Sequence, residues 1–152
     1  MNLSCLERDT APDNEEILQK FLNNNPILFR QFPAKRIFSK PSILTFFDAD
    51  FAILTPQMEL ILIEIEKKTM PLLKRNGDQA APLIHAIDQV GNWIYTFEEH
   101  RLACLDVMKI AREEVATVRG VVIAGRDQGH NPDHLRRLKG RFYNSRISLL
   151  TF

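Results

Sequence analysis

Two apolar segments separated by a short turn, between residues 43 and 68, constrain most strongly what this chain can fold into. Each segment is long enough for a β-strand, and the intervening residues 55–58 contain Pro56 and form a turn signal. A loop of three or five residues centred on Gln57 would pair the segments as an antiparallel hairpin. Both segments nevertheless contain acidic residues, which a buried strand ordinarily lacks.

The acidic side chains are predicted to meet on one face of this hairpin. Because side chains alternate between the faces of a strand, Asp48 and Asp50 share a face of the first segment, and Glu64 and Glu66 share a face of the second. The expected register places Asp50 opposite Glu64 and Asp48 opposite Glu66. Four converging carboxylates are costly unless a proton or a divalent cation neutralises them. The pattern therefore predicts a metal site.

The composition is that of one globular domain. A length of 152 residues, 45% of them hydrophobic and 26% charged, suits a single core, and the net charge of +1 indicates no class of partner. Cys5 and Cys104 form no disulfide or metal motif, and from the sequence we expect neither a signal peptide nor a membrane-spanning run. We therefore expect a cytoplasmic protein with a flexible lead-in at residues 1–12 and a single domain at residues 13–152.

Helical and extended patterns alternate along the rest of the chain. Asn14 is expected to cap a first helix, and residues 36–39 form an edge strand before the hairpin. Apolar residues at helical spacing then predict a long helix, capped by Asp78 and ending near Glu99. The later elements are helices over residues 102–114 and 133–142 and strands over residues 119–125 and 147–152. Without the less regular 102–114 stretch, the order is αβββαβαβ.

This order of elements and acids resembles the PD-(D/E)xK nuclease superfamily, and more closely the DUF4263 family, the catalytic domain of Shedu anti-phage defence proteins. The resemblance is carried by NEEILQKFL at residues 14–22, NP at 25–26, DADF at 48–51, IEIEKK at 63–68, AIDQV at 86–90 and RISLLT at 146–151. No single motif is specific, but the ordered set spans nearly the whole chain. It implies an α/β, restriction-endonuclease-like core with a mixed central β-sheet flanked by helices.

The resemblance also implies a function. Members of this superfamily hydrolyse DNA phosphodiester bonds with Mg²⁺ or Mn²⁺, which aligns a water molecule and relieves charge on the phosphorus. Asp50, Glu64 and the backbone carbonyl of Ile65 are the metal ligands that the resemblance implies. Gln89 on the long helix and Glu15 on the first helix are further catalytic residues by the same resemblance, with Glu16 as the alternative to Glu15.

Glu66 stands where the family motif usually has a lysine that positions or activates the attacking water. Lys67 points to the opposite face of the strand, and Lys68 lies on the correct face but one pleat further along. A second carboxylate can act as a base or hold a second metal. Three hypotheses therefore stay open. The first is an active metal-dependent endonuclease, and the second is a catalytically silent protein of the same fold that binds nucleic acid or mediates assembly. The third is a purely structural interaction module.

A basic cluster near the C-terminus is expected to contact DNA, because an acidic metal site repels phosphate and needs an offsetting charge. Only Asp133 is set against this cluster in the sequence. His130 and His134 are expected to be exposed to solvent. We expect DNA and no membrane as partner, and assembly of several identical copies is left open. The residues expected to bind nucleic acid are Lys68, Arg136, Arg137, Lys139 and Arg141, with Arg146 beyond them.

Overall fold

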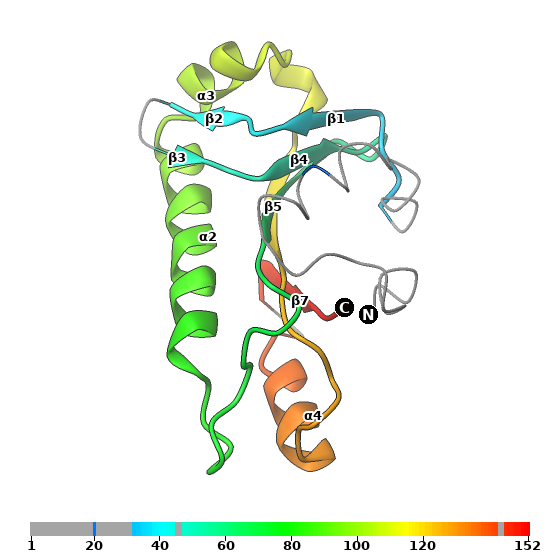
Figure 1. The fold of residues 1–152 in the computed structure, drawn as a ribbon. Coiled ribbons are helices and arrows are strands. Elements are labelled where there is room, and N and C mark those ends of the chain that lie inside the picture. Colours follow the sequence, from blue (N-terminus) through cyan, green and yellow to red (C-terminus); the bar gives the residue numbers. More distant parts are fainter. Residues whose placement is uncertain (1–19, 21–31, 45–46, 143–144) are drawn as a thin grey trace.

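The computed structural model describes residues 20, 32–44, 47–142 and 145–152. Within these ranges the chain forms a five-stranded mixed sheet with helices packed against it (Figure 1). This is the predicted α/β class, and it agrees with a restriction-endonuclease-like core. The predicted first helix, with Glu15 and Glu16, lies outside the described residues.

The central sheet has the strand order β1-β4-β5-β6-β7. Its strands are β1 (Arg36–Ser39), β4 (Phe51–Leu54), β5 (Glu59–Ile65), β6 (Thr117–Ile123) and β7 (Ile147–Leu150). The pairs β1–β4 and β4–β5 are antiparallel, whereas β5–β6 and β6–β7 are parallel. β1 is an edge strand, as predicted. A separate two-stranded sheet of β2 (Ser42–Ile43) and β3 (Phe47–Asp48) was not predicted.

The hairpin of β4 and β5 has the predicted register. Phe51 pairs with Ile63 and Leu54 pairs with Leu60, which leaves Gln57 at the centre of the connection. The backbone N–H of Met58 donates to the Thr55 carbonyl at 3.1 Å and closes the turn. The turn chemistry and the apolar runs were therefore sufficient to fix which residues of the two strands lie opposite each other.

The sheet buries apolar side chains on both faces. One face of β4 and β5 belongs to a core that includes the buried residues of the helices, and the other face belongs to a second core shared with β6 and β7. Burial on both sides explains why these strands read as continuous apolar runs. The first face carries Ala52, Leu54, Leu60 and Leu62, and the second carries Phe51, Ile53, Ile61, Ile63 and Ile65.

The long helix α2 (Ala81–Glu99) covers the first face and ends where the sequence predicts. The apolar repeat on which this helix was predicted consists of Leu83, Ile87, Val90, Ile94 and Phe97. Ile87 is partly buried against the core, and the other four are buried. The predicted cap is wrong, because Ala80 precedes the helix and Pro82 lies in its first turn. Asp78 instead bonds to Asn76 within the preceding loop: its N–H donates to Asn76 Oδ1 at 3.1 Å, and its Oδ2 accepts from Asn76 Nδ2 at 2.8 Å.

The remaining helices are shorter than predicted. The stretch expected as one helix is divided into α3 (Arg101–Met108) and a 3₁₀ turn η3 (Arg112–Glu114), because Lys109 adopts a left-handed conformation with φ of 55°. Helix α4 (Pro132–Gly140) begins after Asn131, whose side chain accepts hydrogen bonds from two backbone N–H groups and caps the helix. Among the helices that the structure describes, none is both long and apolar enough to cross a membrane.

Candidate functional site

Asp50 and Glu64 are the next residues on the two strands beyond the last pair of the β4–β5 ladder, Phe51 and Ile63. The N–H of Asp50 donates to the Ile63 carbonyl at 3.1 Å, so the chain is still attached to β5 at this point. The Asp50 Oδ2 atom accepts a hydrogen bond from the backbone N–H of Ile65 at 2.7 Å. The carboxylate thus takes the place of a strand partner at the end of β5.

Both acids are buried, with 8% of Asp50 and 6% of Glu64 exposed. A buried carboxylate needs compensating hydrogen bonds or positive charge, and the Ile65 N–H supplies one such bond to Asp50. In a β-strand the N–H and C=O of one residue point to the same side, so the Ile65 carbonyl is directed to the side on which Asp50 lies. Two carboxylates and a carbonyl form a hard oxygen donor set that suits Mg²⁺ or Mn²⁺.

The prediction that Asp48 faces Glu66 is wrong. Asp48 lies in β3, where it pairs with Ser42, and its Oδ1 accepts a hydrogen bond from Ser42 Oγ at 2.7 Å. The chain bends at Asp50, so β3 and β4 belong to different sheets. Over residues 32–44, 47–142 and 145–152, no group of three or more His, Cys, Asp or Glu side chains is arranged to hold a metal. The expected four-carboxylate cluster is therefore reduced to Asp50 and Glu64.

Glu66 and Gln89 are both half-buried. Glu66 follows β5 directly, and its backbone N–H donates to the Ile123 carbonyl of β6 at 2.8 Å. Gln89 lies on α2 between the buried residues Ala86 and Val90, so it is carried by the helix that covers the first face of the sheet. By strand alternation, that is also the face of Glu64.

The basic residues of the C-terminal region divide into two groups. Three of them are held by acidic side chains: Arg136 by Asp133 at 3.2 Å, Lys139 by Asp127 at 2.8 Å and Arg146 by Glu98 at 2.9 Å. The expectation that only Asp133 opposes this cluster is therefore wrong.

Lys68, three residues after β5, is buried with 9% of its surface exposed.

Asp127 is the acid that the sequence reasoning missed. Burial alone would raise the pKa of Asp127, but hydrogen bonds from Lys139 Nζ and Thr151 Oγ1, both 2.8 Å long, and the nearby Lys139 charge hold it below the ordinary value. Thr151 follows β7, so these bonds connect α4 to the end of the last strand. No sequence motif marks this contact, because it joins three segments that meet only in the folded chain.

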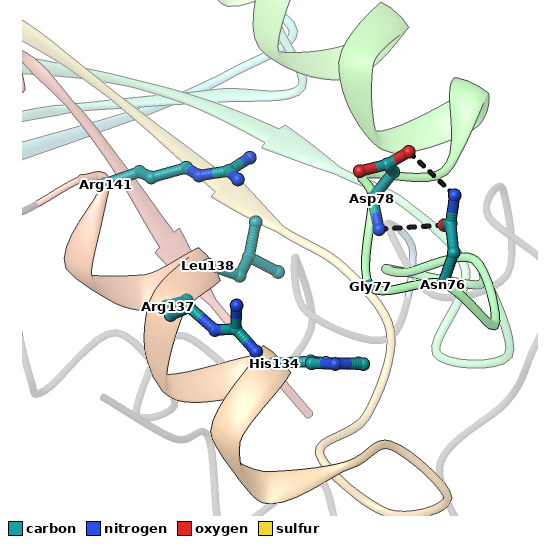
Figure 2. A pocket seen from close by; sticks show the side chains of 7 residues that line it. All are labelled: Asn76, Gly77, Asp78, His134, Arg137, Leu138 and Arg141. Atoms are coloured by element: carbon teal, nitrogen blue, oxygen red, sulfur yellow. Dashed lines mark hydrogen bonds between the residues drawn. The ribbon is translucent and has the colours of Figure 1, made fainter.

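The second group, Arg137 and Arg141, lines a pocket between α4 and the loop before α2 (Figure 2). The volume of the pocket is about 90 Å³. His134 lies in its wall and is half-buried, which corrects the expectation of an exposed histidine. The other lining residues are Asn76, Gly77, Asp78 and Leu138.

Residues 13–152 match the family described as Shedu protein SduA, C-terminal. No curated protein matches the chain. The family match covers nearly the whole sequence and agrees with the resemblance carried by the sequence motifs. The chain therefore belongs to the Shedu SduA C-terminal family.

Proposed function

We propose that this chain is a metal-dependent nuclease domain that hydrolyses DNA phosphodiester bonds in anti-phage defence. Membership of the Shedu family supports the role in defence. The observation that carries the chemistry is the buried pair Asp50 and Glu64 at the end of β5, with the Ile65 backbone between them and Glu66. Acidic groups kept in a buried position beside a backbone carbonyl are suited to a divalent cation.

In this proposal Asp50, Glu64 and the Ile65 carbonyl hold Mg²⁺ or Mn²⁺. When bound, the ion lowers the pKa of water and stabilises negative charge at the phosphorus. The hydrogen bond from the Ile65 N–H to Asp50 Oδ2 fixes the orientation of that carboxylate, a supporting role that metal sites commonly require. Glu66, next on the chain, accepts the proton of the attacking water, and Gln89 and Glu15 complete the catalytic residues.

DNA is the partner that the remaining charges favour. The acidic pair repels phosphate, and basic side chains must offset that repulsion. Lys68, Arg136, Arg137, Lys139 and Arg141 are proposed to supply this positive charge. Arg136 and Lys139 would have to exchange their acidic partners for phosphate, whereas Arg137 and Arg141 form no ion pair within the described residues.

The alternative function is a catalytically silent protein that binds nucleic acid or mediates assembly. It is favoured by one observation, the glutamate at position 66 where the motif usually has lysine. The two functions predict the same DNA binding but differ in turnover.

The test is calorimetric titration of Mn²⁺ into the wild type, Glu64→Gln and Glu59→Gln, followed by incubation of each with linear and circular duplex DNA and Mg²⁺. Glu59 is the matched control because it lies at the other end of the same strand, where its Oε1 accepts from Arg119 Nε at 2.8 Å. We expect Mn²⁺ binding and cleavage in the wild type and the control and neither in Glu64→Gln. Binding and cleavage that persist in Glu64→Gln would refute the site. Metal and DNA binding without cleavage in the wild type would establish the silent alternative.

A further inference from the structure

Arg137 and Arg141 differ from the other cations of the C-terminal basic cluster because they have no acidic partner among the described residues. The guanidinium groups of Arg136 and Arg146 and the ammonium group of Lys139 each have a carboxylate partner. In the part of the chain that the structure describes, Arg137 has only a long hydrogen bond, from its Nε to the Asp133 carbonyl at 3.5 Å, and Arg141 has no side-chain hydrogen bond or ion pair. Two guanidinium groups are therefore available for a ligand.

These two side chains project from α4 and the residue after it towards the loop that carries Asn76 and Asp78, with Leu138 between them (Figure 2). Residues 134, 137, 138 and 141 repeat at the spacing of one helix face, so the face is continuous. Two guanidiniums against the single carboxylate of Asp78 leave the lining with a net positive charge before His134 is counted. The lining therefore favours an anion.

The size of the pocket limits the ligand to one compact group. A volume of about 90 Å³ is well below the roughly 300–1,000 Å³ of pockets that enclose a drug-sized molecule. One wall of the pocket is a close approach of two segments: Gly77 has φ of 90°, and a Cβ at this position would lie 2.9 Å from Nδ1 of His134. A side chain larger than that of glycine at position 77 would therefore press against the imidazole.

The position of the pocket relates it to the acidic pair. β5 and β6 are parallel, so their carboxyl ends lie at the same edge of the sheet. The loop with Asn76, Gly77 and Asp78 follows β5, and α4 follows β6, so the pocket is built from two segments that leave the sheet at this end (Figure 1). Asp50 and Glu64 lie next to the last β4–β5 pair, Phe51 and Ile63, and therefore at the same end of β5.

We infer that this pocket binds a single phosphate group of a nucleic acid strand, held by the guanidinium groups of Arg137 and Arg141 with His134 at its wall. The choice of a nucleic acid as the source of the phosphate rests on the proposed function. Paired guanidinium groups match phosphate oxygens in charge and in geometry. The pocket is a binding subsite, and it positions the strand without reading its sequence.

The experiment follows the ring signals of the four histidines by ¹H–¹³C NMR in phosphate-free buffer with EDTA, with the His134 signal assigned from His134→Gln. Sodium phosphate and a 12-base-pair DNA duplex are added separately to the wild type, Arg137→Gln/Arg141→Gln and Arg112→Gln. Arg112→Gln is the control, since Arg112 is an exposed arginine of the 3₁₀ turn η3, outside the basic cluster that is proposed to contact DNA. Arg141→Gln alone is the substitute if the double variant does not fold.

We expect both probes to shift the His134 signal in the wild type and the control. In the double variant, the ligand concentration that gives half of the full shift should be at least tenfold higher. The magnitude of the slope of log K for the duplex against log salt should fall by about 1 in the double variant, because the pocket holds one phosphate. The inference is overturned if neither probe shifts His134, if the double variant responds like the wild type, or if phosphate shifts the signal and the duplex does not. This experiment contains no divalent metal, so its result does not depend on the metal site. A failure to bind Mn²⁺ or to cleave DNA in the test of the proposed function therefore overturns that function alone.

Discussion

Two substitutions of Asp50 separate its role in holding the fold from its proposed role as a metal ligand. Asp50→Asn keeps a side-chain oxygen that can accept the hydrogen bond from the Ile65 N–H but removes the negative charge. Asp50→Ala removes both the charge and the acceptor. The first substitution should therefore abolish Mn²⁺ binding while the fold is kept, and the second should abolish binding and also destabilise the protein.

The magnitude follows from the burial of the hydrogen bond. Ile65 is fully buried, so its N–H has no access to water once the carboxylate is removed. A hydrogen bond to a charged group contributes about 1.5–3 kcal/mol, and a buried donor left without an acceptor costs about 1–3 kcal/mol. We expect Asp50→Ala to lower the free energy of unfolding by about 1.5–3 kcal/mol. For a chain of this length that corresponds to a fall in Tm of roughly 3–12 °C.

The assay is urea unfolding in EDTA, together with Mn²⁺ calorimetry on the same samples. Asp50→Asn should unfold within about 1 kcal/mol of the wild type, with an unchanged m-value. Destabilisation of Asp50→Asn to the level of Asp50→Ala would show that the negative charge itself, and not the hydrogen bond, holds the end of β5. Mn²⁺ affinity retained in Asp50→Asn would refute its assignment as a ligand.

Two further predictions concern packing and pH. Gly120→Ala places a Cβ 2.1 Å from Cγ1 of Val90 and should cost about 1–3 kcal/mol of stability, part of which Val90→Ala restores in the double variant; additive losses in urea unfolding would contradict this contact. The pKa of Asp127 lies below its ordinary value of 3.8, so the stabilisation it provides is complete above that pH and is lost as the pH falls through the lowered pKa. Unfolding of wild type and Asp127→Asn between pH 2 and 7 should therefore show a stability difference at neutral pH that disappears in acid, and a difference independent of pH would contradict the role of Lys139 and Thr151.

The elements that the sequence predicted best are those determined by neighbours along the chain. The alternation of side chains and the turn at residues 55–58 were enough to pair Phe51 with Ile63, and hence to place Asp50 and Glu64 next to each other in the register. Asp48 was misplaced because alternation was carried through the bend at Asp50, whereas pairing with Ser42 takes Asp48 into another sheet. The alternation of side chains along the sequence does not show at which residue a strand ends.

The helix boundaries and charge pairs show the same limit. The carboxylate of Asp78 could accept the hydrogen bonds of a helix cap, but Asp78 is instead hydrogen-bonded to Asn76 within the loop. The hydrogen bond from Thr151 to Asp127 and the approach of Gly77 to His134 both join segments that the sheet brings together. Interactions of this kind depend on the packing of the whole domain, and a single sequence does not encode them in any local pattern.

The bond between Asp50 and the Ile65 N–H joins residues only 15 positions apart. The phosphate pocket, by contrast, depends on segments separated by the whole of α2, α3 and β6. The two features are therefore exposed to evolutionary change in different ways. Insertions in the loop before α2 or in the segment between β6 and α4 can remodel the pocket while the acidic pair stays in place, so the two features can change independently.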